Sequence, residues 1–125
     1  RFRVGTKGAE IHESVFPLEG ETVITKHVGD SFAHTALEAI LHNAGVEEIA
    51  VCGSMIHMCV DAFLRAATAR DFRCALLSDA CATRDLEWDG RAVAAADVET
   101  ALFAAFSFFG VRMTDAAGWA RELPG

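Results

Sequence analysis

The sequence predicts a single α/β domain with a three-layer α/β/α, Rossmann-like parallel sheet. Short β-branched or apolar segments alternate along the 125 residues with segments whose apolar residues recur at helical spacing. Glycines follow two of the helical patterns, and no linker, repeat or low-complexity tract divides the chain. A chain of this length suits one domain and can bury a hydrophobic core.

Four strands and four helical segments are expected. Asp30 and Ser31 are typical N-caps for the first helix, and Gly45 is a typical stop at its C-terminal end. The first twenty residues and residues 79–90 read as loops. The predicted strands are 22–25, 48–52, 73–78 and 111–114, and the predicted helices are 31–43, 58–69, 92–109 and 116–122.

Composition and charge exclude several classes of protein. Eleven Lys and Arg against eighteen Asp and Glu give a net charge of −7, whereas nucleic-acid binders need clustered positive charge. The longest apolar stretch, 101–111, is much shorter than the roughly 20 residues of a membrane span. We therefore expect neither a nucleic-acid nor a membrane partner.

The four cysteines favour reduced thiols in a cytoplasmic protein. The chain is too poor in cysteine for a disulfide framework, and its Cys-x6-Cys spacings do not match those of zinc ribbons. The His spacings do not build a metal cluster either, so no metal or other cofactor is expected.

Cys59 is the leading candidate for a reactive group. Sites in open α/β sheets lie at the carboxyl ends of strands, and Cys59 follows such a strand end at the first turn of a predicted helix. Unpaired N–H groups and the helix dipole favour a thiolate there, and the same N–H groups could stabilise an oxyanion. The alternative is an inert cysteine buried at a helix start.

Other candidates lie near the same edge of the sheet. Cys81 also follows a strand, but it lies in a polar loop without an evident helix start. Lys26 ends the first predicted strand, where it either holds an anion or is simply solvated. His57 is two residues before Cys59, a spacing that does not place two side chains face to face on a helix, so a position at the rim is expected.

Two separated motifs resemble the isochorismatase-like cysteine hydrolases, the family of nicotinamidases, N-carbamoylsarcosine amidohydrolase and streptothricin hydrolase. Residues 53–85, GSMIHMCVDAFLRAATARDFRCALLSDACATRD, resemble the nucleophile turn and the Asp-Ala pair after the next strand, here Asp79-Ala80. Upstream, VITKHVGDSFAHTAL resembles the segment of the catalytic lysine, which would be Lys26. The resemblance covers about residues 4–114.

The resemblance implies roles for particular residues. Cys59 would be the nucleophile, Lys26 the cation that stabilises its thiolate, and the backbone N–H groups of Met55 and Cys59 the oxyanion hole. A cis peptide bond would join Ser54 to Met55. The pocket expected around the substrate is formed by Phe32, His57, Met58 and Trp88.

The chain also departs from the family pattern. Ile56 stands at the usual Thr, and Phe63 and Leu64 replace smaller or hydroxyl residues. The family's activating Asp ends a first strand that nothing in residues 1–20 resembles. Because the family's strand order resembles 3-2-1-4-5-6, this chain would supply strands 3, 4, 5 and 6. With Arg at position 1, we expect residues 1–125 to form one domain that is incomplete at its N-terminus.

The predicted function is that of a cysteine-dependent hydrolase of an amide or related C–N bond in a small molecule, through a thioester-type intermediate. A catalytically inactive remnant that binds or scaffolds is the alternative. A true isochorismatase, which cleaves a vinyl ether, is disfavoured because that branch can lack the nucleophilic Cys. The resemblance also implies a homo-oligomer, consistent with the Phe-rich stretch that contains Phe103, Phe106, Phe108 and Phe109.

Overall fold

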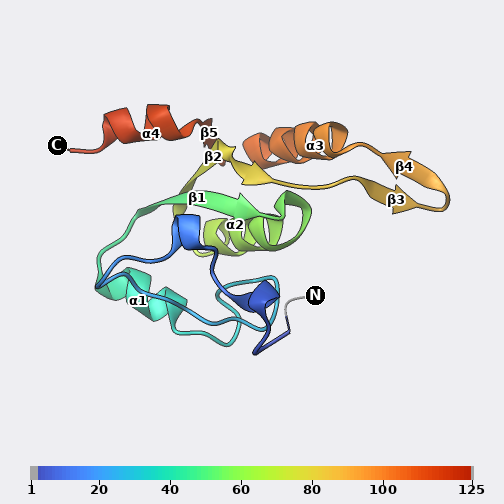
Figure 1. Ribbon diagram of the computed structural model, residues 1–125. Coiled ribbons are helices and arrows are strands. Elements are labelled where there is room, and N and C mark those ends of the chain that lie inside the picture. Colours follow the sequence, from blue (N-terminus) through green and yellow to red (C-terminus); the bar gives the residue numbers. More distant parts are fainter. Residues whose placement is uncertain (1–2, 125) are drawn as a thin grey trace.

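The computed structural model describes residues 3–124 and contains a three-stranded parallel sheet at its centre (Figure 1). The strands lie in the order β1-β2-β5, with β1 at Glu48–Ser54, β2 at Arg73–Ala82 and β5 at Arg112–Thr114. This is the order 4-5-6 implied by the family resemblance, and the α/β fold class is confirmed.

Three helices pack on the sheet, namely α2 (Asp61–Thr68), which a π-helical turn (Ile56–Val60) precedes, α3 (Ala95–Phe108) and α4 (Ala116–Glu122). A further helix, α1 (Leu37–Asn43), lies beside α2, and its Glu38 pairs with Arg70 (Figure 1). Side chains alternate along a strand, so Val51 and Leu76 face the core with α2 and α3. Glu48 faces the other way, where Arg112 bonds both Glu48 and Glu122 of α4.

The core explains why these helices form where they do. Leu64 and Phe106 are fully buried, one from α2 and the other from α3, and they meet the apolar residues of β1 and β2. Gly45 follows α1 with a φ of 66°, a conformation that favours glycine, and the Val46 N–H donates to the Leu41 carbonyl. The predicted stop at Gly45 is confirmed, and the predicted range of α4 is that of the structure.

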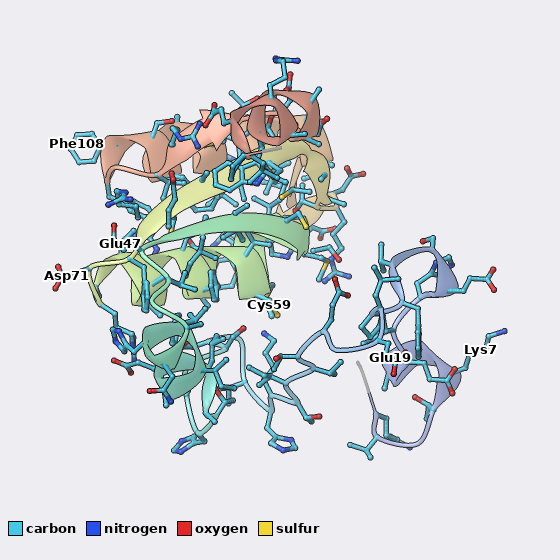
Figure 2. All side chains as sticks on the ribbon, turned by 90° about the vertical axis from the view of Figure 1, so that its left-hand side faces the viewer. Lys7, Glu19, Glu47, Cys59, Asp71 and Phe108 are labelled. Atoms are coloured by element: carbon cyan, nitrogen blue, oxygen red, sulfur yellow. The ribbon has the colours of Figure 1, made fainter. Side chains whose placement is uncertain are left out.

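The predicted strand at 22–25 is wrong. These residues have no regular secondary structure, and β1 pairs only with β2 within residues 3–124. A β-branched segment forms a strand only where a neighbour offers main-chain partners, and here no strand lies next to it. Residues 3–36 contain only short 3-10 turns, Lys7–Ala9 and Glu13–Val15. Figure 2 shows Lys7 and Glu19 on a segment that stands apart from the sheet.

Several other boundaries differ from the prediction. The helix predicted at 58–69 begins as a π-helical turn at Ile56, and the helix predicted at 92–109 begins only at Ala95. The first helix starts at Leu37 instead of 31, because the Asp30 carboxylate accepts from the Phe32 N–H in a turn and the Thr35 hydroxyl accepts from the Leu37 N–H. The predicted loop 79–90 contains the end of β2 and the strand β3 (Leu86–Trp88). β3 forms an antiparallel hairpin with β4 (Arg91–Val93), which occupies the predicted start of the third helix. Asp89 and Gly90 both have positive φ at its turn.

Leu64→Ala should lower the free energy of unfolding by about 3 kcal/mol, because it leaves a cavity where a fully buried side chain was. Leu18→Ala is the matched control, since Leu18 is 73% exposed and should cost less than about 0.5 kcal/mol. Urea unfolding followed by circular dichroism measures both. Equal losses in the two variants would contradict this assignment of the core.

Candidate functional site

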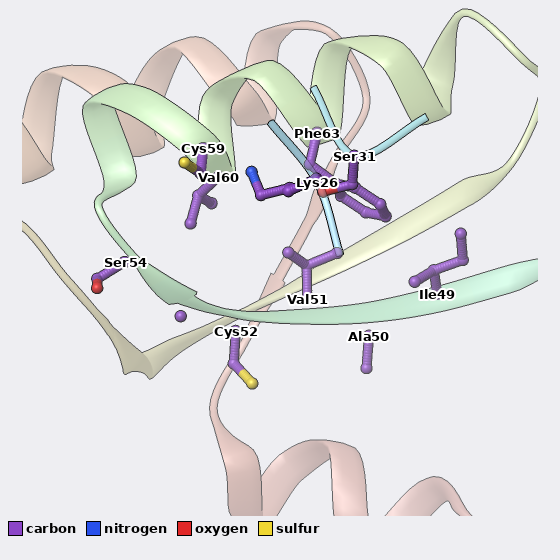
Figure 3. A pocket seen from close by; sticks show the side chains of 11 residues that line it. Lys26, Ser31, Ile49, Ala50, Val51, Cys52, Ser54, Cys59, Val60 and Phe63 are labelled. Atoms are coloured by element: carbon purple, nitrogen blue, oxygen red, sulfur yellow. The ribbon is translucent and has the colours of Figure 1, made fainter. Parts of the chain in front are cut away.

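An open cavity of about 360 Å³ runs along the free edge of β1 (Figure 3). Six consecutive residues of β1, from Ile49 to Ser54, line it from one side. The loop before α1 and the start of α2 line the other, through Lys26, Ser31, Cys59, Val60 and Phe63. Cys59 and Lys26, predicted from separate motifs, therefore line the same cavity.

Cys59 lies in the π-helical turn that follows β1. The turn is closed by hydrogen bonds from the N–H groups of Met58 and Val60 to the Met55 carbonyl, with N···O distances of 2.9 and 3.3 Å. Ile56 and Val60 are buried in the core, so the Cys59 side chain is directed towards the cavity, where it is half-buried. Gly53 precedes the turn with a φ of 131°, and the peptide bond from Ser54 to Met55 is cis, as the resemblance implies.

Lys26 extends into the cavity towards Cys59 (Figure 3). Its ammonium donates to the Gly29 carbonyl, with an Nζ···O distance of 2.6 Å, which fixes the side chain across its own loop. Within residues 3–124 no carboxylate forms an ion pair with Lys26, so its positive charge remains available to an anion in the cavity.

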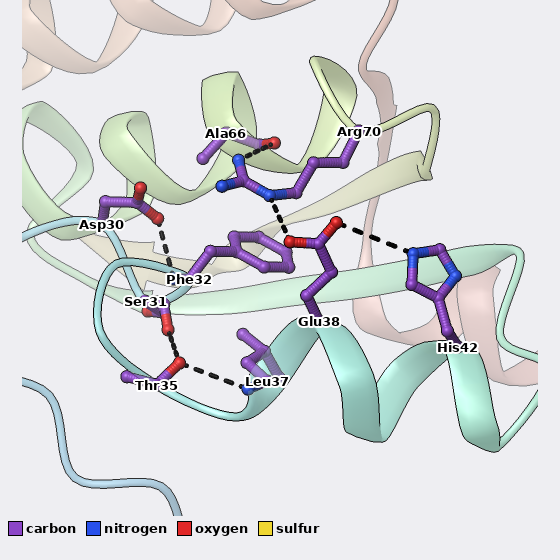
Figure 4. Close-up of polar contacts among 9 residues, drawn as sticks. All are labelled: Asp30, Ser31, Phe32, Thr35, Leu37, Glu38, His42, Ala66 and Arg70. Carbon is purple, nitrogen blue, oxygen red and sulfur yellow. Dashed lines mark hydrogen bonds and ion pairs between the residues drawn. The ribbon is translucent and has the colours of Figure 1, made fainter.

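Phe32 holds the loop that bears Lys26 against the core, in which the Phe32 side chain is buried. The Phe32 ring stacks on Phe63, with ring centroids 5.3 Å apart, and on Phe72, at 6.1 Å. The Arg70 guanidinium lies 4.7 Å from the centre of the Phe32 ring and bonds the Glu38 carboxylate at 3.1 Å (Figure 4). These contacts join the loop, α1 and α2 around one buried ring.

The structure distributes the predicted pocket residues over different places. Phe32 is 5% exposed and belongs to the core. His57 bonds Thr83, Met58 is half exposed, and Trp88 is 85% exposed on the β3–β4 hairpin. None of these four is among the residues that line the cavity.

The sequence does not assign most of the lining residues to the site, and Ser31 and Phe63 are two of these. Ser31 is predicted as a helix cap, and Phe63 as a departure from the family pattern. The signal for Phe63 was its position four residues after Cys59, which places both on one face of a helix.

The remaining cysteines differ in their surroundings, and all four are free thiols. Burial raises the pKa of Cys74 to about 11, and the negative charge of Glu48 adds to the effect. Burial also raises the pKa of Cys81, although a hydrogen bond from the Gly53 N–H opposes the shift. Cys52 is exposed and points to the side of β1 opposite Val51.

The raised pKa of Cys74 predicts a loss of stability in alkali. The folded protein keeps the Cys74 proton up to about pH 11, whereas the unfolded thiol loses it near pH 9. The free energy of unfolding is therefore unaffected by the ionisation of this thiol below pH 9 and decreases as the pH rises from 9 to 11. Between pH 8 and pH 10.5, the wild type should lose about 2 kcal/mol more unfolding free energy than Cys74→Ala. Urea titrations under reducing conditions measure both, and equal losses would contradict the shift.

Neither a metal site nor a membrane-spanning helix is found within residues 3–124. No group of three or more His, Cys, Asp or Glu side chains there could hold a metal ion. None of the helices in that range is long and apolar enough to cross a membrane.

A half-buried thiol and a lysine at the carboxyl end of a parallel strand are groups that α/β proteins use in nucleophilic sites. The family model of the isochorismatase domain matches residues 1–107. The chain belongs to the isochorismatase family.

Individual relatives agree with this assignment. The chain is 47% identical over 106 residues to the isochorismatase family protein YddQ of Bacillus subtilis, with 85% of the chain and 59% of YddQ covered. It is 41% identical over 115 residues to a streptothricin hydrolase of Streptomyces noursei, with 92% and 37% covered. A solved cysteine hydrolase from Pseudomonas syringae superposes with a TM-score of 0.87 at 28% identity, covering 91% of this chain and 54% of that one. The chain thus spans only part of the length of these relatives.

Proposed function

We propose that this protein is a cysteine-dependent hydrolase of an amide or related C–N bond in a small molecule. The observation that carries the proposal is the placement of Cys59 and Lys26 in one cavity at the carboxyl end of β1. The similarity to a streptothricin hydrolase and to a cysteine hydrolase supports the same reaction class.

In the proposed reaction, the Cys59 sulfur attacks the carbonyl carbon of the substrate. Its proton passes to a carboxylate and then to the leaving nitrogen as the C–N bond breaks, which leaves a thioester on Cys59. Water hydrolyses the thioester, releases the acid and restores the thiol. The Lys26 ammonium stabilises the thiolate by its charge, and the N–H groups of Met55 and Cys59 stabilise the oxyanion.

We propose that the carboxylate comes from a further strand that pairs with β1. The edge of β1 that faces Lys26 has no partner within residues 3–124. Asp30 is not suited to the role, because its carboxylate is engaged by the Phe32 N–H at 2.8 Å. The greater length of the relatives is consistent with such a strand, and residues 1–125 would then form one incomplete domain.

The intact mass of the native polypeptide tests the origin of this strand. A mass well above 13.4 kDa is expected if the strand belongs to the same polypeptide. A native mass of 13.4 kDa would overturn that origin and require a second chain to supply the carboxylate.

Two broader properties complete the proposal. The four free thiols are consistent with a cytoplasmic protein. A homo-oligomer would cover apolar surface on α3, where Phe108 is 94% exposed and lies far from Cys59 (Figure 2).

Cys59→Ala should lower the rate of hydrolysis at least about 1,000-fold, since the other thiol that lines the cavity, Cys52, points to the side of β1 away from Lys26. Cys52→Ala is the matched control, because Cys52 lines the same cavity on the other side of β1 and should keep most of the activity. Ammonia release from nicotinamide and other small amides, and hydrolysis of streptothricin, are the assays. Activity that survives Cys59→Ala would contradict the nucleophile.

An inactive binding module is the competing function. It predicts that Cys59 in the wild type reacts with iodoacetamide at neutral pH no faster than the exposed Cys52. The proposed hydrolase predicts a Cys59 rate at least about tenfold higher.

A further inference from the structure

The π-helical turn that bears Cys59 has one side-chain hydrogen bond to another element. The His57 Nδ1 and the Thr83 Oγ1 lie 2.6 Å apart, although the residues are 26 positions apart in the sequence. Both side chains are half-buried. Within residues 3–124, no other side chain of the turn from Met55 to Val60 is recorded in a hydrogen bond, so this contact is the turn's polar anchor.

The buried side chains of the turn are Ile56 and Val60, which pack in the core. Met58, by contrast, is half exposed. A π-turn departs from regular helical hydrogen bonding, so its side-chain directions depend on contacts outside the helix. The bond to Thr83 supplies such a contact two residues before Cys59.

Thr83 is itself firmly placed. It follows Ala82, which is the register partner of Ser54 at the end of the β1–β2 ladder. Two residues further on, the Asp85 carboxylate accepts from the Ala95 N–H at the start of α3, with an O···N distance of 2.8 Å. Thr83 is therefore held between the sheet and α3.

A hydroxyl is a suitable hydrogen-bond partner for either tautomer of an imidazole. The Thr83 O–H can donate to an Nδ1 that carries no proton, and the same oxygen can accept from an Nδ1–H. The bond between His57 and Thr83 is therefore compatible with both tautomers.

We propose that His57 is a positioning residue that orients the Cys59 thiol through its hydrogen bond to Thr83. The proposal rests on the proposed role of Cys59 as nucleophile. His57 lies outside the residues that line the cavity and acts through the turn. Loss of the bond should therefore change the reactivity of Cys59 and leave that of Cys52 unchanged.

The test is the rate of iodoacetamide alkylation at Cys59 and Cys52 in the same molecule, read by peptide mass spectrometry. Thr83→Val removes the hydroxyl at nearly constant shape and should slow Cys59 about fivefold or more, with Cys52 and the melting temperature little changed. Thr83→Ser should restore the Cys59 rate. Thr100→Val is the matched control, because the Thr100 hydroxyl bonds only its own helix at the Ala96 carbonyl.

Two results would overturn the proposal: a Cys59 rate in Thr83→Val within about twofold of the wild type, or a Thr83→Ser rate as slow as that of Thr83→Val. If Thr83→Val fails to fold, two variants of His57 replace it. His57→Leu removes the hydrogen bond and should slow Cys59 alkylation, whereas His57→Asn can keep the bond and should preserve the rate. The proposed hydrolase is tested separately by the wild-type ratio of Cys59 to Cys52. A low ratio of the Cys59 rate to the Cys52 rate in the wild type therefore contradicts the role of Cys59 as nucleophile. An unchanged Cys59 rate in Thr83→Val contradicts the positioning role of His57.

Discussion

The geometry of the candidate site depends on the burial of one aromatic ring, that of Phe32. Residues 3–36 form no strand, so main-chain pairing does not hold the segment that bears Lys26 against the body. The segment is held instead by the Phe32 ring, which stacks on Phe63 and Phe72 and lies against the Arg70 guanidinium. Because Phe63 also lines the cavity, the same stack fixes the loop and shapes the wall beside Cys59.

The fold could be predicted wherever local pattern and tertiary environment agree. The parallel strands β1, β2 and β5 are apolar runs between helices, and Gly45 and Gly110 end helices with positive φ. The segment at 22–25 has the same β-branched composition as a strand, but composition cannot supply the neighbour that a strand requires. The β3–β4 hairpin was missed although Asp89-Gly90 is a typical two-residue turn, because the polar residues around it favoured a loop.

The site was predictable to a different degree for each residue. Cys59 and Lys26 follow from motif and position, and they line one cavity. The walls of the pocket depend on which residues from distant segments come into contact. The spacing of residues along the sequence does not predict those contacts. Phe32 and Trp88 are predicted to lie at the substrate pocket, whereas the Phe32 ring is buried in the core and Trp88 is 85% exposed. The contact between His57 and Thr83 likewise depends on the path of β2 and could not be read from a separation of 26 residues.

The edge of β1 that has no partner within residues 3–124 also has a consequence for which strands it can accept. Ile49, Ala50, Val51 and Cys52 present main-chain donors and acceptors without a charged side chain or a proline among them. Such an edge is a template for pairing with another edge, and natural proteins protect theirs with charge, bulges or covering segments. Where no strand covers this edge, the same main-chain groups can pair with those of another copy. The net charge of −7 opposes such contact at long range until salt screens the repulsion.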